Sequence, residues 1–243
     1  CLALPIGGTA VGTGYNSHPR WAQLMASELG DIYSCDFRPA KNKFSQMASH
    51  DALRGVHGQI SGLATALYKI SSDIRLMNSG PRCGFSEITI PANKPGSSIM
   101  PGKVNPTQVE ALTMVCLRVI GNDASIAMAN SQGQFQLNTY KPLIIHQLLE
   151  SITLLTDACV SFTDRCLIGI KANSDQLEAQ SRHSLMLATA LVPELGYDKT
   201  AKLVGIASTE GLSLKEAAIE AGYMTPEEFD LKINPAFMLG PSR

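Results

Sequence analysis

The sequence predicts an all-α protein, in which a bundle of long helices is followed by a small helical C-terminal domain. Three stretches, 53–77, 106–130 and 142–163, carry apolar residues at alternating spacings of three and four. That repeat is typical of helices that pack on other helices. Aromatic residues are sparse at 6%, with a single Trp, whereas Ala, Leu, Ile and Met are abundant. This composition suits helices better than sheets.

The stretch 53–77 has the clearest repeat. Its apolar residues form a heptad-like seam, which must pack on other helices. Ser79-Gly80-Pro81 is expected to end the helix, because glycine and proline cannot continue it without cost. The seam consists of Leu53, Val56, Ile60, Leu63, Leu67, Ile70, Ile74 and Met77.

Two further stretches complete the predicted bundle. The helix over 106–130 is apolar on several faces and is therefore expected to be buried on most sides. Its main stripe is Val109, Leu112, Cys116, Val119 and Ile126. The helix over 142–163 begins with Pro142, which fits a first turn. Its stripe is Ile145, Leu148, Ile152, Leu155, Cys159 and Phe162.

After 169–173 the pattern changes to short elements. The segments Ser213-Leu-Lys-Glu216 and Thr225-Pro-Glu-Glu228 are capping boxes, and each is expected to open a short helix. We therefore predict two domains: a helical bundle over 1–172 and a small helical domain over 173–243.

Composition also limits the partners. The net charge is −1 with mixed signs, so no basic surface for nucleic acid is expected. No apolar run approaches the roughly 20 residues of a membrane span, so no membrane partner is expected either. The six cysteines include no C-x-x-C pair, which predicts buried, reduced thiols and an intracellular, reducing compartment.

The stretch 94–110 is the most informative for function. Its Gly-, Ser- and Pro-rich loop runs directly into a helix start, where Asn105 is predicted to be the N-cap. Pro106 would then occupy the first helical position and Gln108 the capping-box position.

A helix start of this kind favours an anion. Lys103 adds a full positive charge, and Ser97 and Ser98 supply hydroxyl groups. The residues alone leave two interpretations open: a site for a small carboxylate or phosphate beside a serine, or a connecting loop without a ligand.

The run Gly96-Ser97-Ser98-Ile99-Met100-Pro101-Gly102-Lys103-Val104-Asn105-Pro106 resembles the signature loop of the fumarase/aspartase superfamily. Gly102, where aspartases tend to carry Ala, favours the class II fumarase branch, as does Gly196-Tyr-Asp-Lys199. The resemblance covers about the C-terminal half of the family pattern. It implies a helical core shared in a homotetramer, active sites shared between subunits, and no metal or other cofactor.

The resemblance implies a lyase that reversibly hydrates fumarate to (S)-malate, by anti addition and elimination through an aci-carboxylate. Such a reaction needs a base, stabilisation of the carbanion-like intermediate, and an acid. The family pattern places the base at Ser97 and the carboxylate contacts at Lys103 and Asn105, with Ser98 as a further substrate-binding residue. Glu110 matches a residue that orients a histidine from another subunit.

None of the five histidines in this chain matches the family's histidine motif, so the chain by itself is expected to be inactive. Two alternatives stay open: an aspartate ammonia-lyase, or a non-catalytic scaffold of the same fold. Lys94 and Gln136 stand where the fumarase pattern carries Glu. A fumarase of this kind serves the tricarboxylic acid cycle, so we expect it in the cytoplasm or, in a eukaryote, in the mitochondrion.

Overall fold

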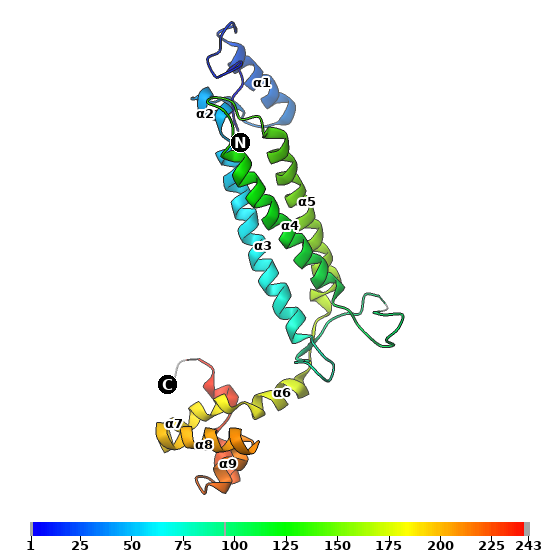
Figure 1. Cartoon of the computed structure of the whole chain (residues 1–243), viewed down its shortest axis with the longest axis vertical. Coiled ribbons are helices and arrows are strands. Elements are labelled where there is room, and N and C mark those ends of the chain that lie inside the picture. Colours follow the sequence, from blue (N-terminus) through cyan, green and yellow to red (C-terminus); the bar gives the residue numbers. More distant parts are fainter. Residues whose placement is uncertain (1, 95, 241–243) are drawn as a thin grey trace. The chain divides into compact units, whose positions relative to one another are not determined.

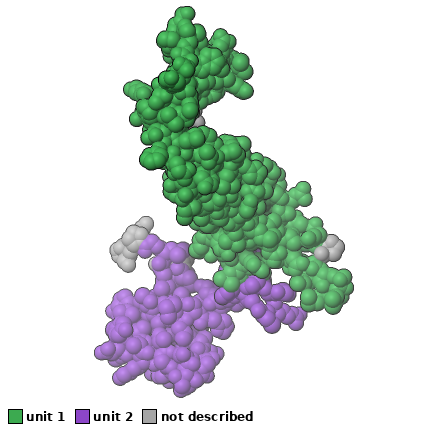
Figure 2. Space-filling model, turned by 45° about the horizontal axis from the view of Figure 1, so that its top comes forward, with its two compact units in different colours: residues 1–78, 90–170 green, residues 79–89, 171–243 purple. Residues whose placement is uncertain are grey.

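The computed structural model describes residues 2–94 and 96–240. The chain divides into two compact units, residues 1–78 with 90–170 and residues 79–89 with 171–243 (Figure 2). Among the described residues, strands are limited to four two-residue segments in two small sheets. The predicted all-α bundle fold is therefore confirmed. The domain division between 172 and 173 stays a prediction.

Three long helices form the first unit's bundle: α3 (Asp51–Met77), α4 (Thr107–Asn130) and α5 (Lys141–Arg165) (Figure 1). Helix α4 packs against both α3 and α5 along its length. The shorter elements of this unit are β1 (Ala3–Leu4), α1 (Trp21–Tyr33), β2 (Arg38–Pro39), α2 (Lys43–Ala48) and η1 (Leu167–Gly169). Strand β1 pairs in parallel with β2.

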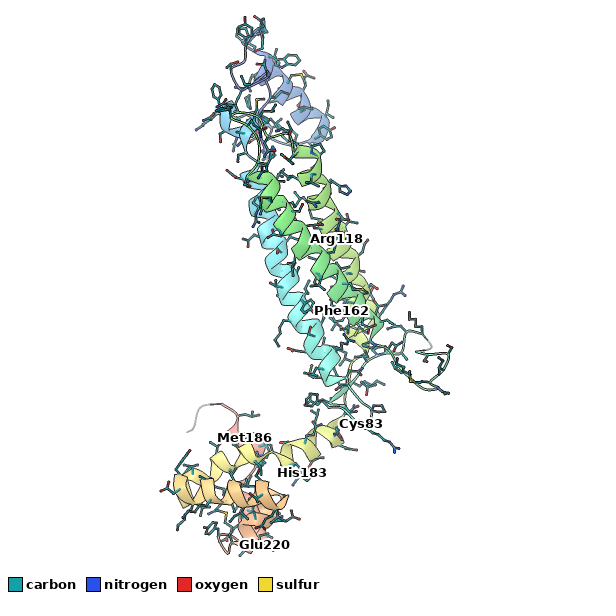
Figure 3. The ribbon with its side chains drawn as sticks, viewed as in Figure 1. Cys83, Arg118, Phe162, His183, Met186 and Glu220 are labelled. Atoms are coloured by element: carbon teal, nitrogen blue, oxygen red, sulfur yellow. The ribbon has the colours of Figure 1, made fainter. Side chains whose placement is uncertain are left out.

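The predicted stripe of α4 is confirmed. Each of its five members is at most 1% exposed: Val109, Leu112, Cys116, Val119 and Ile126. Because α4 packs against both α3 and α5, these five residues are covered by this chain alone. The expectation that the helix is buried on most sides is wrong, since Met114, Leu117 and Met128 are more than half exposed. On α5, the predicted Phe162 is likewise buried, at 2% exposed (Figure 3).

The seam predicted for α3 is partly wrong. Val56 and Ile70 are about half exposed, at 47% and 49%, whereas the neighbouring residues His57 and Ser71 are fully buried. The buried positions of α3 include the polar residues His57 and Ser71, so the spacing of apolar residues alone did not identify the face of this helix that packs in the bundle.

The seam predicted for α5 is also only partly wrong, because its members Leu148, Leu155 and Phe162 are buried. Ile144 and Ser151 are buried, while Ile145 and Ile152 remain exposed. A hydrogen-bonded serine therefore occupies an inward position that the apolar pattern assigned to its isoleucine neighbour.

A polar layer, made of His57, Asn122, Asp123 and Ser151, links the three helices. The His57 ring places Nδ1 2.9 Å from Asp123 Oδ1 and Nε2 2.9 Å from Ser151 Oγ. The Asn122 amide donates to Ser151 Oγ at 3.0 Å. A neutral ring that donates from Nδ1 and accepts the Ser151 proton at Nε2 satisfies these groups, as buried polar atoms require.

Ion pairs extend this layer to the surface of the bundle. Arg54 donates to Asp123 at 2.9 Å, and Arg118 (Figure 3) pairs with Glu150 at 3.0 Å. A hydrogen bond from Asn122 and the Arg118 guanidinium lower the pKa of Glu150. Ion pairs at the surface therefore flank the polar layer on two sides, through Asp123 and through Glu150.

Two helices of the bundle, α4 and the segment Lys141–Gly169, are long and apolar enough to cross a membrane by length and composition. The expectation that no apolar run approaches that length is therefore corrected. Core helices of soluble proteins pass the same test, and α4 and α5 contribute polar residues to the layer between them. The expectation of no membrane partner stays a prediction.

The cysteines follow the prediction only in part. Cys116 and Cys166 are buried and Cys159 is half-buried, and burial raises the pKa of each thiol. Cys35 and Cys83 are exposed, contrary to the prediction, because they lie in turns outside the helical core. Cys1 lies outside the described residues.

The second unit consists of short helices around its own apolar core. Strand β3 (Ile88–Thr89) pairs antiparallel with β4 (Lys171–Ala172). The helices are α6 (Ser174–His183), η2 (Leu185–Leu191), α7 (Val192–Leu195), α8 (Tyr197–Glu210), α9 (Leu214–Glu220), α10 (Pro226–Lys232) and η3 (Pro235–Met238). Both predicted capping boxes are confirmed, at the starts of α9 and α10.

The polar layer predicts a stability effect. Replacing Ser151 with Ala leaves His57 Nε2 and one Asn122 N–H group unpaired in the core. We expect the free energy of unfolding of the full-length protein to fall by about 1–3 kcal/mol, which is the usual cost of such groups. Thr153→Ala, at an exposed position of the same helix, is the matched control in a urea titration. Equal effects of the two substitutions would contradict the role of the layer.

Candidate functional site

The predicted site residues lie on the loop over 96–106 and in the first turn of α4. This loop lies at the end of the bundle where α3 ends and α4 begins (Figure 1). The Ile90 N–H group donates to Asn78 Oδ1 at 3.2 Å, which ties the chain that enters the loop to the end of α3. The bundle therefore supports the loop at both of its ends.

A side-chain hydrogen bond closes the loop. Asn105 Nδ2 donates to the Gly96 carbonyl oxygen at 2.6 Å. Gly96 also lies directly against the backbone of Lys103, where an added Cβ would be 1.7 Å from the Lys103 carbonyl oxygen. Only glycine fits there, so the two arms of the loop meet at this point.

The predicted helix start is wrong by one residue. Helix α4 begins at Thr107, and its N-cap is Pro106, which makes no side-chain capping bond. Asn105 does not cap because its amide group closes the loop instead. Gln108 does not form a capping box, since its Oε1 accepts a hydrogen bond from Ser161 of α5 at 2.8 Å.

The Ser97 hydroxyl is surrounded by donors of its own loop. Its Oγ accepts hydrogen bonds from the backbone N–H groups of Ile99, at 3.1 Å, and Met100, at 3.0 Å. Two such donors stabilise negative charge on the oxygen they share. Ser98 follows directly and is exposed.

Ser97 and Lys103 line a common hollow of about 420 Å³, a volume that suits a small ligand. Among the described residues, the lining is Ala92, Asn93, Lys94, Gly96, Ser97, Gly102, Lys103 and Val104. No acidic residue is among these. The sequence pattern identified Lys103 as a site residue but did not identify Lys94. The signal that could have identified Lys94 is its positive charge directly before the loop.

Glu110 lies apart from this hollow. It stands in the first turn of α4 and accepts a hydrogen bond from Arg75, in the last turn of α3, at 3.3 Å. The sequence pattern did not identify Arg75, which is near Glu110 only in the folded bundle. The histidine partner expected for Glu110 stays a prediction.

Lys141 lines another hollow and has its own partners. Its Nζ donates to the carbonyl oxygens of Asn138, at 2.7 Å, and Met47, at 3.2 Å, and lies 3.3 Å from His50 Nε2. Burial lowers the pKa of Lys141, and burial together with Lys141 lowers the pKa of His50. These contacts give Lys141 a structural role.

Within residues 2–94 and 96–240, no group of three or more His, Cys, Asp or Glu side chains is placed to hold a metal ion. The expectation that the site needs no metal or other cofactor stays a prediction.

Comparisons with known proteins give a consistent set of relatives. The family described as Lyase matches residues 1–121, and the family described as Fumarase C C-terminus matches residues 187–240. The class II fumarate hydratase of Methylorubrum extorquens is 52% identical over 241 residues, which are 99% of this chain and 51% of that protein. The mitochondrial fumarate hydratase of Rhizopus oryzae is 51% identical over 233 residues, 96% of this chain and 47% of that protein.

A solved structure agrees with these relatives. The class II fumarase of Schistosoma mansoni has a TM-score of 0.88 and 44% sequence identity, over 100% of this chain and 54% of that one. The chain therefore spans about half the length of the curated relatives it matches.

The contact of Gly96 with Lys103 predicts that Gly96→Ala opens the loop. We expect hydration of fumarate, the reaction that the resemblance implies, to slow about 10²-fold in the full-length protein, the cost of a 1 Å misplacement. The matched control is Gly205→Ala on α8, where an added Cβ meets nothing within 4 Å. A Gly96→Ala variant as active as this control would contradict the close packing.

Proposed function

The chain belongs to the class II fumarase family of lyases, and from that premise we propose that the full-length protein reversibly hydrates fumarate to (S)-malate. The observation that carries the proposal is the environment of Ser97. Its oxygen accepts two backbone N–H bonds and lines the same hollow as Lys103. A serine in these surroundings can act as a base next to a bound carboxylate.

In malate dehydration, the Ser97 alkoxide removes a proton from the carbon beside a carboxylate. The electron pair of the broken C–H bond moves into that carboxylate and forms the aci-carboxylate. The electron pair then returns to form the C=C bond of fumarate as the C–O bond of the neighbouring carbon breaks on the opposite face. An acid protonates the departing hydroxide to give water, and Ser97 is left as a neutral hydroxyl. Positive charge at Lys103 stabilises the extra negative charge of the intermediate, where such stabilisation lowers the barrier.

The other residues have supporting roles in this proposal. Asn105 holds the loop closed and has a second amide hydrogen for the substrate carboxylate. Ser98, the exposed residue next to Ser97, would add a hydroxyl to substrate binding. Glu110, held by Arg75, would orient a histidine from another subunit.

We further propose that the protein is a homotetramer with shared active sites. Exposed apolar side chains support this, because such residues mark surfaces that bind protein. Met114, Leu117 and Met128 of α4 are more than half exposed. A hollow of about 380 Å³ between α3 and α5 is lined by Ile60, Leu63, Ile152, Leu155, Thr156, Cys159 and Val160.

The compartment follows from the same family. We place the protein in the cytoplasm or, in a eukaryote, in the mitochondrion, where the Rhizopus oryzae relative is named. The fumarase reaction would give it a role in the tricarboxylic acid cycle.

The proposed base is tested with two substrates in parallel. The full-length protein should form fumarate from (S)-malate and not from aspartate, and Ser97→Ala should lower this turnover by at least about 10²-fold, as loss of a base does. Ser208→Ala, an exposed serine of α8, is the control. Turnover of aspartate alone would assign the protein to the ammonia-lyases, and no turnover of either would favour a scaffold.

Lys103 is tested by binding. We expect Lys103→Ala to raise the Kd for fumarate by about 10-fold or more, since a charge-assisted hydrogen bond is lost. Lys199→Ala, in the second unit, is the control, and both constants are measured by equilibrium titration. An unchanged Kd for Lys103→Ala would remove this residue from the carboxylate site.

A further inference from the structure

We propose that Lys94 is a second cationic substrate-binding residue of the hollow beside Ser97. In this inference Lys94 and Lys103 each bind one end of a small dianion, and the pair favours dianions over monoanions. The inference rests on the proposed function only for the identity of that dianion as a dicarboxylate.

The loop closure brings the two lysines together. Lys94 precedes the loop and Lys103 lies near its end, nine positions later in the sequence. Gly96 contacts the Lys103 backbone, and Asn105 donates a hydrogen bond to the Gly96 carbonyl. These two contacts hold the beginning and the end of the loop together. Both lysines then line one hollow, and Ser97 lines it with them.

The charge of this hollow is not balanced by the protein. The described residues that line it include two lysines and no acidic residue. Within the described part of the chain, neither lysine forms an ion pair, whereas Lys215 pairs with Asp230 at 2.6 Å. Both ammonium groups belong to exposed residues, so they are free to turn toward a ligand.

Two uncompensated positive charges around a small hollow repel each other and create a positive potential. An anion between them relieves the repulsion and gains attraction from both. A monocarboxylate can neutralise only one ammonium group, whereas a dicarboxylate can neutralise both. Lys94 therefore contributes to selectivity for charge as well as to affinity.

The test compares two probes with the same carbon chain, the dianion succinate and the monoanion butyrate, in titrations of the full-length protein. We expect Lys94→Ala to raise the Kd for succinate about tenfold and to change the Kd for butyrate by less than about threefold. Lys94→Arg keeps the charge and should stay within about threefold of wild type for both probes. Lys94→Glu should weaken succinate binding more than Lys94→Ala does.

The matched control is Lys202→Ala, which removes an exposed lysine of α8 in the second unit. The effect of Lys94→Ala on succinate binding should also shrink as salt is raised from about 0.1 M to about 1 M, because the Debye length falls from about 10 Å to about 3 Å. The inference would be overturned if Lys94→Ala bound succinate as tightly as Lys202→Ala does. It would also be overturned if Lys94→Ala and Lys94→Arg weakened succinate binding equally.

Fumarate hydration by the wild-type protein separates this inference from the proposed function. If the protein hydrates fumarate but its succinate affinity does not change in Lys94→Ala, the inference about Lys94 is wrong and the proposed function stands. Succinate binding that depends on Lys94, in a protein that hydrates no fumarate, would sink the proposed function alone.

Discussion

The hydrogen bond between Asn105 and the Gly96 carbonyl is the contact on which the candidate site depends. It joins the two ends of the loop over 96–106. Once these ends meet, Ser97, Lys103 and Lys94 line one hollow. Gly96 is the residue that allows this, since any side chain there would meet the Lys103 carbonyl oxygen. The chemistry of the loop therefore follows from one amide group and one missing Cβ.

The bundle positions this loop through the ends of two helices. The loop follows a segment tied to the end of α3 and runs into the start of α4, where Arg75 and Glu110 meet. Farther along the bundle, the polar layer around His57 fixes how α3, α4 and α5 pack against one another, since its hydrogen bonds are satisfied in one arrangement. A unique packing of the helices also fixes where their ends lie. The polar layer thus contributes to the geometry of the site, although it holds none of the proposed catalytic residues.

The sequence pattern predicts this structure where local chemistry decides it. The apolar stripe of α4 and the capping box at Ser213 follow from residue spacing alone, and both are present. The pattern fails where a residue has two possible partners. Asn105 could cap α4 or close the loop, and Ser151 could face solvent or join His57 in the core. The pattern also did not predict the contact between Arg75 and Glu110, because the two residues are 35 positions apart in the sequence.

The most direct test is a crystal structure of the full-length protein with (S)-malate bound. We predict one malate carboxylate within about 2.6–3.2 Å of Lys103 Nζ, and Ser97 Oγ facing the carbon beside that carboxylate. The Ile99 and Met100 N–H groups should still donate to Ser97 Oγ in that complex. Malate bound away from this loop, or a Ser97 hydroxyl turned away from the ligand, would contradict the account.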